Sequence, residues 1–87
     1  MSPELVLSLF QRAALVIART QRIPVESITL DSTFEQLKID SLDGINILFA
    51  IEGEFDIDIP DEDARQIRSV REMVEGIEKL VAAKQVQ

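Results

Sequence analysis

The sequence predicts an all-α protein, an irregular four-helix bundle with three longer helices, one short helix and a long first loop. Three observations indicate this fold class. Apolar residues recur every three or four positions in three segments. Four segments open with residues that favour a helix start. The single alternating segment has no partner with which to form a sheet. A chain of 87 residues is expected to form one domain, residues 1–87.

The first helix is expected at about residues 3–20, with Ser2 as a cap and Pro3 at its first position. Its apolar stripe comprises Val6, Leu9, Phe10, Ala13, Val16 and Ile17. Residues 21–40 break this pattern and predict a long connection, which its own apolar residues would pin to the core. Within it, Ser32 and Glu35 have the spacing of a capping box, which predicts a single turn near residues 34–37.

The second helix is expected at about residues 41–54, with Asp40 as its N-cap. Five residues are predicted to share one face: Leu42, Ile45, Leu48, Phe49 and Glu52. Ile47 and Ile51 widen the apolar stripe of this helix. Residues 56–60 alternate like a strand, but an isolated strand is not stable, so we interpret them as an extended loop.

Two further helices complete the predicted bundle. A short helix is expected at about residues 61–67, with acidic residues at the positive end of its dipole. The last is expected at about residues 70–84, after a capping box of Ser69 and Glu72. Its buried stripe comprises Val70, Met73, Val74, Ile77, Leu80 and Val81.

The residue types that are missing exclude several kinds of chemistry. The chain contains no Cys and no His, so it has no thiolate nucleophile, no imidazole base and no soft metal site. Residues 56–63 also fail the pattern of a calcium loop, because Pro60 and Asp61 take its fifth and sixth positions. Acid/base chemistry by paired carboxylates remains possible in principle. Because the chain is too small to enclose a substrate cleft, we expect no catalytic residue, no metal site and no enzymatic activity.

The net charge of −7 bounds the kinds of partner. Phosphates would repel the chain, which argues against nucleic acid, whereas basic protein surfaces would attract it. No apolar run approaches the length that a membrane span needs, and no signal-peptide pattern opens the sequence. We expect a cytoplasmic monomer.

Ser41 is the most informative polar residue. It follows the predicted N-cap Asp40, so its hydroxyl lies in the first turn of a helix. Backbone N–H groups in a first turn have no helical partner, and a phosphate esterified to Ser41 would lie beside them. Without further signals, Ser41 would be an ordinary helix-start serine.

The residues around Ser41 resemble the acyl carrier protein family over about residues 30–81. The matching segments stand in the family's order and spacing: Phe34–Leu37, Asp40–Leu42, Glu52–Phe55, Ile59–Glu62, Ile67 and Ser69–Val70. The resemblance implies that a phosphopantetheinyl transferase attaches 4′-phosphopantetheine to Ser41, with Asp40 and Leu42 beside it. The thiol of the arm would hold an acyl group as a thioester, for fatty acid, lipid or polyketide-type biosynthesis.

The resemblance also implies that the second helix docks partner enzymes, which transfer or modify acyl groups and have basic surfaces. The docking residues expected on it are Asp43, Ile45, Asn46, Glu52 and Glu54. Ten acidic residues and one basic residue, Lys38, lie between positions 35 and 63. Such a density favours docking of basic surfaces, although a merely solvated acidic face would give the same composition.

Departures from the family pattern suggest a specialised carrier. Lys38 stands where the family often has Gly, and Asn46 and Gly53 stand where it often has Glu. Two alternatives stay open: a peptidyl or aminoacyl carrier of a nonribosomal-type pathway, and an acidic interaction module whose Ser41 is never modified. In a carrier, the apolar stripes could also part to shelter an acyl chain.

Overall fold

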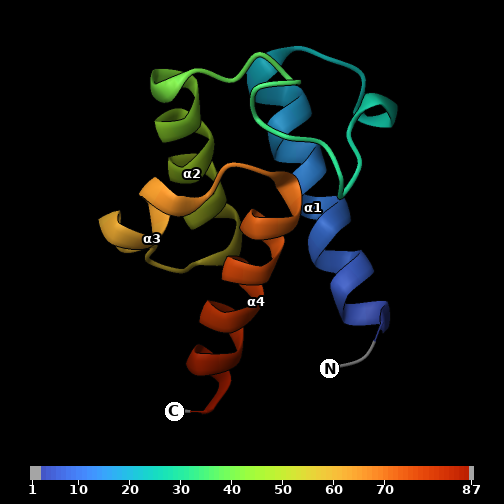
Figure 1. The fold of residues 1–87 in the computed structure, drawn as a ribbon. Helices are drawn as coiled ribbons and strands as arrows, with labels where there is room; N and C mark the ends of the chain where they lie inside the picture. The colour runs from blue at the N-terminus through green and yellow to red at the C-terminus, as the bar shows by residue number, and fades with distance from the viewer. Residues whose placement is uncertain (1–2, 87) are drawn as a thin grey trace.

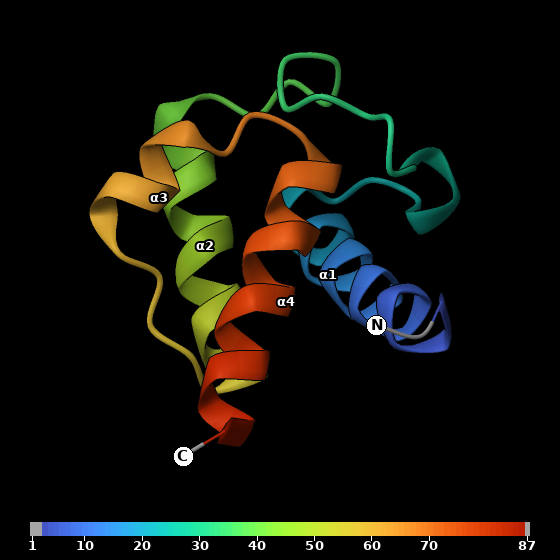
Figure 2. The ribbon, with the colours of Figure 1, turned by 60° about the horizontal axis from the view of Figure 1, so that its bottom comes forward.

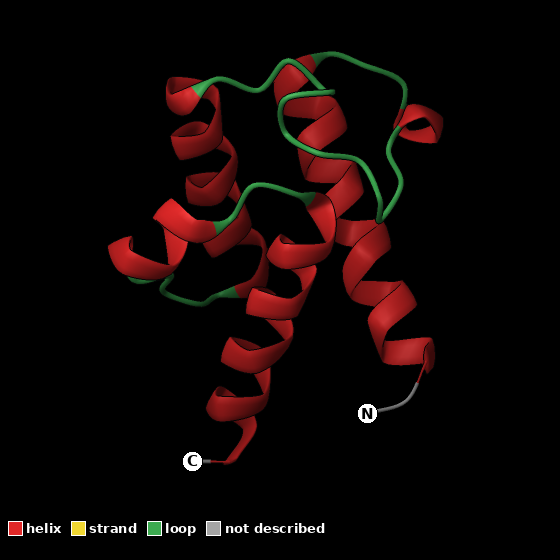
Figure 3. Cartoon of the chain, in the orientation of Figure 1, coloured by secondary structure: helices red, strands yellow, loops and turns green. Residues whose placement is uncertain are grey.

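The computed structural model of the chain describes the backbone of residues 3–86 and the side chains of residues 8–84 (Figure 1). Its helices are α1 (Pro3–Gln21), a 3₁₀ turn η1 (Val25–Ser27), α2 (Ser41–Phe55), α3 (Asp61–Gln66) and α4 (Val70–Val86). Loops join them, and the described residues contain no strand (Figure 3). The predicted all-α bundle and the extended loop at 56–60 are confirmed, while η1 was not predicted.

Three long helices form the body of the molecule. α1 packs against both α2 and α4, and the short α3 lies on the outside beside α2 and α4 (Figure 2). The long connection between α1 and α2 crosses the end of the bundle at which α2 begins (Figure 1). This arrangement brings the start of α2 close to the long connection and to α3.

The core is almost entirely aliphatic. The largest side chains with less than 2% exposure are Ile17, Ile47, Ile51, Met73, Ile77, Val70 and Val74. They come from α1, α2 and α4, so the predicted stripes of α1 and α4 are confirmed. The predicted cap Ser2 and the side chain of Val6 lie outside the described residues.

The predicted apolar stripe of α2 is confirmed at Ile47 and Ile51, whereas the predicted central face of the helix is wrong. Ile47, Ile51 and Phe55 are its buried residues, whereas Leu42 is 67% exposed and Phe49 is 74% exposed. α2 has apolar residues around most of its circumference, so spacing alone could not select the buried row. Packing against α1 and α4 selects the row spaced by four residues.

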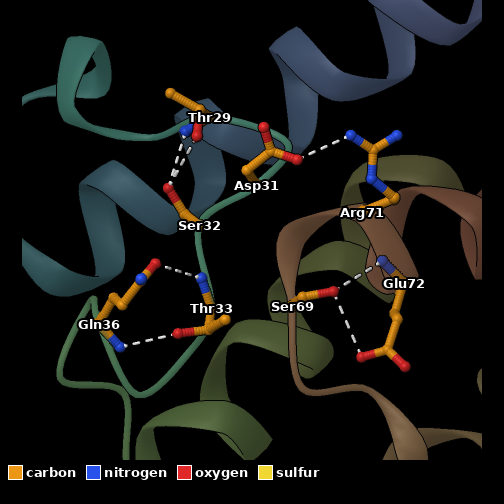
Figure 4. Close-up of polar contacts among 8 residues, drawn as sticks. All are labelled: Thr29, Asp31, Ser32, Thr33, Gln36, Ser69, Arg71 and Glu72. Atoms are coloured by element: carbon orange, nitrogen blue, oxygen red, sulfur yellow. Dashed lines mark hydrogen bonds and ion pairs between the residues drawn. The ribbon is translucent and has the colours of Figure 1, made fainter.

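The predicted capping box in the long connection is displaced by one residue. Thr33 Oγ1 accepts a hydrogen bond from Gln36 N (3.1 Å), and Gln36 Oε1 accepts one from Thr33 N (3.0 Å) (Figure 4). Ser32 is buried, and its Oγ accepts from Thr29 N instead (3.0 Å). Glu35 therefore does not close the box, although the predicted turn at 34–37 forms.

The capping box before α4 is confirmed. Ser69 Oγ accepts from Glu72 N (3.1 Å), and Glu72 Oε1 accepts in return from the backbone N of Arg68 (2.9 Å). α3 ends at Gln66, one residue before its predicted end, and α2 extends one residue beyond its predicted end, to Phe55.

Backbone hydrogen bonds join the long connection to the segment that precedes α4. Phe34 N donates to Arg68 O (2.9 Å), and Val70 N donates to Ser32 O (3.0 Å). We call this pair of bonds the loop bridge. An ion pair between Arg71 and Asp31 (2.9 Å) lies beside it (Figure 4). The loop bridge therefore fixes the long connection against the start of α4.

A second long-range contact fixes the other end of α2. Asp56 ends this helix in the left-handed conformation (φ 55°). Lys84 Nζ lies 2.7 Å from Asp56 Oδ2 and 2.9 Å from its backbone oxygen. Lys84, in the last turn of α4, therefore ties α4 to the end of α2.

The contact between Lys84 and Asp56 predicts a pH-dependent effect. The hydrogen bond from Lys84, followed by its positive charge, lowers the pKa of Asp56. A carboxylate with a lowered folded-state pKa stabilises the fold above its unfolded pKa of about 3.9, and this stabilisation is lost as pH falls through the folded-state pKa. Lys84→Gln should therefore lower the thermal midpoint at pH 7, and by less at pH 3. Lys79→Gln on the same helix is the control, and an effect independent of pH would contradict the assignment.

The buried row of α2 predicts losses of stability of very different size for two nearby isoleucines. Ile47 is fully buried, so Ile47→Ala should reduce the free energy of unfolding by about 3 kcal/mol. Ile45 is 60% exposed, so Ile45→Ala should cost about 0.5 kcal/mol or less. Urea unfolding curves of the two variants measure the difference. Equal losses would contradict the orientation of α2.

Candidate functional site

Asp40 fixes the first residue of α2. Its backbone is extended, and its Oδ1 accepts a hydrogen bond from Asp43 N (2.8 Å). Its backbone oxygen accepts from Gly44 N (2.8 Å), the first bond of the helix. The predicted N-cap is confirmed, and α2 begins at Ser41.

Ser41 is exposed at this helix start. Among the described residues, no hydrogen bond engages its hydroxyl. The N–H groups of Ser41 and Leu42 precede the first helical bond, so both remain available to an acceptor. The positive end of the helix dipole adds to these donors. A serine whose ester carries a negative phosphate fits this position.

An open groove of about 930 Å³ begins at Ser41. One wall is the first half of α2, and the other is formed by α3 and the residues that follow it. Apolar side chains from the long connection, α2 and the α3 end line it: Phe34, Ile39, Ile45, Leu48, Ala64 and Ile67. A flexible arm attached to Ser41 could therefore lie along an apolar surface that starts at its own anchor.

Lys38 shows why its position often holds Gly in the family that the sequence resembles. Its φ is 59°, in the left-handed region that glycine adopts without steric cost. Its N–H donates to Glu35 O (3.0 Å), which closes the turn. The departure at Lys38 thus leaves the turn intact and adds a positive charge two residues before Asp40.

The five predicted docking residues fall into two groups. Asp43, Ile45 and Asn46 lie on the first half of α2, where Ile45 and Asn46 are exposed and Asp43 is half-buried. Glu52 and Glu54 lie on the second half, and both hold the fold together. The structure therefore does not bring the five residues together as one free surface.

Glu52 and Glu54 are engaged in contacts within the chain. Glu52 Oε2 accepts from the backbone N of Ile59 (2.9 Å), which ties down the loop after α2. Glu54 pairs with Arg12 of α1 (3.0 Å), whose guanidinium also lies 4.3 Å from the ring centre of Phe55. Both carboxylates are therefore less available to a partner than the sequence suggested.

An exposed apolar row extends on α2 beyond the predicted docking residue Ile45. Leu42, Ile45 and Phe49 are spaced by three and four residues and are 67%, 60% and 74% exposed. The sequence predicted Ile45 as a docking residue, but Leu42 and Phe49 were assigned to the apolar face and not to docking. We call the outer surface of α2 formed by Leu42, Asp43, Ile45, Asn46 and Phe49 the α2 face.

The described residues show neither a metal-binding cluster nor a membrane-spanning helix. Across this part of the chain, no three residues of the kinds that ligate metals are grouped closely enough to hold an ion. None of the helices described is both long enough and apolar enough to pass through a lipid bilayer.

Comparison with known proteins supplies an independent observation. Residues 12–77 match the family model described as "Phosphopantetheine attachment site". The chain is 41% identical over 70 residues to an acyl carrier protein of Rickettsia bellii (strain RML369-C). This alignment covers 79% of the chain and 81% of the relative. It is 39% identical over 69 residues to a mitochondrial acyl carrier protein of Dictyostelium discoideum. This alignment covers 79% of the chain and 58% of that longer relative.

The cap at Asp40 predicts a specific pattern of stability. Asp40→Ala removes the acceptor for Asp43 N and should lower the free energy of unfolding by about 1 kcal/mol. Asp40→Asn keeps an equally good cap and should change it little. Chemical denaturation of both variants tests this, and a large loss with Asn would assign the effect to charge instead of capping.

Proposed function

The chain belongs to the acyl carrier protein family, and we propose that Ser41 carries the 4′-phosphopantetheine arm of this carrier. The thiol of the arm holds an acyl group as a thioester, and the chain presents it to enzymes that transfer or modify acyl groups. The observation that carries this proposal is the exposed hydroxyl of Ser41 at a capped helix start, which no described residue engages in a hydrogen bond.

The residues around Ser41 suit this role chemically. The arm supplies a thiol, which a chain without Cys cannot provide. The N–H groups of Ser41 and Leu42 stabilise the negative charge of a phosphodiester at the helix start. Asp40 holds these groups in place by capping the helix, so it acts as a positioning residue.

The α2 face is the proposed docking surface for the transferase and for the acyl-handling enzymes. Its three apolar side chains stand next to Ser41 in the same helix, so a bound enzyme would lie close to the arm. Asp43 gives the face a negative charge, which a basic rim on the enzyme would complement. Because Glu52 and Glu54 are engaged within the chain, apolar contact should contribute more than their charges.

The pathway proposed is fatty acid, lipid or polyketide-type biosynthesis. Asn46 and Lys38 make the surface near Ser41 less acidic than the family pattern, which supports a specialised set of partner enzymes. A single carrier domain spanning residues 1–87 and a monomeric state are part of the proposal. Cytoplasmic residence stays a prediction, because one relative is named as a mitochondrial protein.

Attachment at Ser41 is tested by the intact mass of the protein. The chain is incubated with coenzyme A and a broad-specificity phosphopantetheinyl transferase, beside Ser41→Ala as the control. We expect a gain of one phosphopantetheine in the parent chain and none in the control. If an active transferase leaves the parent mass unchanged, the interaction module without a cofactor becomes the better interpretation.

Docking on the α2 face is tested by the rate of that same modification. Ile45→Ser should lower kcat/KM of the transferase about fivefold or more, the effect of losing a central apolar contact. Leu15→Ser changes an apolar residue on α1 that is 44% exposed and should leave kcat/KM roughly unchanged. Circular dichroism checks that both variants are folded. Equal effects would indicate that the α2 face has no special part in docking.

A further inference from the structure

Two guanidinium groups border the groove that begins at Ser41. Arg65 lies in the last turn of α3, and Arg68 lies in the segment between α3 and α4. Both side chains are exposed. The ion pairs formed within the described part of the chain use Arg12, Arg71 and Lys84, so neither groove arginine is paired there.

The backbone that carries these arginines is firmly held. Arg68 O accepts from Phe34 N (2.9 Å) in the loop bridge, and Arg68 N donates to Glu72 (2.9 Å). Arg65 lies about one turn earlier, in α3. This helix is closed at its C-terminal end by a hydrogen bond from Ile67 N to Ala64 O. The long-range bonds fix the backbone of Arg68, and both arginines lie on the same wall of the groove.

The charges around the groove bear on what these arginines can bind. Glu35, Asp40 and Asp61 also line it. One oxygen of Asp40 is already used by the helix cap, and no carboxylate among the described residues pairs with Arg65 or Arg68. In a chain of net charge −7, two guanidinium groups without an ion-pair partner among the described residues thus line the same groove as Ser41.

We propose that Arg65 and Arg68 bind an anionic oxygen group of the molecule attached to Ser41. This inference rests on the proposed function. It adds that the groove favours a molecule with an anionic oxygen group over a purely alkyl one. An alkyl chain would gain little from these charges, whereas a guanidinium group presents paired N–H donors that match a carboxylate or a phosphate. The anion has two sources: the phosphodiester of the arm, or a carboxylate at the far end of the acyl group.

Four forms of the protein separate these sources: apo, holo, glutaryl-loaded and pentanoyl-loaded. The two acyl groups have the same number of carbons, and only glutaryl ends in a carboxylate. Intact mass confirms loading of each form. The arginine side-chain Nε–H signals in ¹⁵N nuclear magnetic resonance spectra report contact with an anion, and the signal of Arg19 on α1 serves as the reference.

We expect the Arg65 and Arg68 signals to move well beyond that of Arg19. A shift from apo to holo that persists in both acyl forms identifies the phosphodiester as the anion. A shift that appears with glutaryl and not with pentanoyl identifies the carboxylate. Loading without any such shift overturns the inference while leaving the carrier function intact. Absence of loading at Ser41 overturns the proposed function, and this inference with it.

A double variant tests the same inference by stability. If the arginines bind the anion, its attachment should raise the thermal midpoint of the parent chain by a few degrees, as expected for a charge-assisted contact in a small domain. Arg65→Gln/Arg68→Gln should lose most of this gain, and added salt should weaken it. Arg19→Gln is the control with one charge removed elsewhere. An equal gain in the double variant contradicts the inference.

Discussion

The loop bridge is the interaction on which the candidate site depends. The connection between α1 and α2 is long, and ordering it costs conformational entropy that its own short turns cannot offset. The bonds from Phe34 to Arg68 and from Val70 to Ser32 attach it to the segment before α4. The same bonds place the start of α2 opposite α3. The groove and its opening at Ser41 follow from that placement.

One side of α2 packs in the core, and the other side is the proposed docking surface. One row of side chains, Ile47, Ile51 and Phe55, is buried in the core. The other side forms the α2 face, whose apolar side chains have no partner in this chain. An exposed apolar surface is typical of a protein-binding site, and this one lies on the same helix as the exposed Ser41. The proposed attachment site and the proposed docking surface therefore share a single helix.

The sequence predicted the class of fold because each helix start carries its own local signal. Asp40 and Ser69 cap their helices through contacts within three residues, and such contacts depend little on the rest of the fold. The same local reasoning failed where two neighbours compete for one role. Ser32 and Thr33 both offer a hydroxyl near the right spacing, but Ser32 Oγ accepts from Thr29 N, which leaves Thr33 to close the turn.

The candidate site was also predictable only in part, because only some of its features depend on local sequence. Ser41 follows from local pattern, whereas the buried row of α2 depends on which helices pack against it. The engagement of Glu54 also depends on tertiary structure, because its partner Arg12 lies 42 residues away. The unpaired state of Arg65 and Arg68 likewise becomes visible only when all side chains around the groove are in place.

The most direct test of the account is the position of the modification in protein purified from a host with an active transferase. Trypsin cleaves after Lys38 and Arg65, and Ser41 is the only hydroxyl-bearing residue in the peptide of residues 39–65. Mass spectrometry of that peptide therefore locates the attachment without ambiguity. If Ser41 carries the arm, we expect a phosphopantetheine on this peptide. An arm found on any other peptide, with residues 39–65 unmodified, would contradict it.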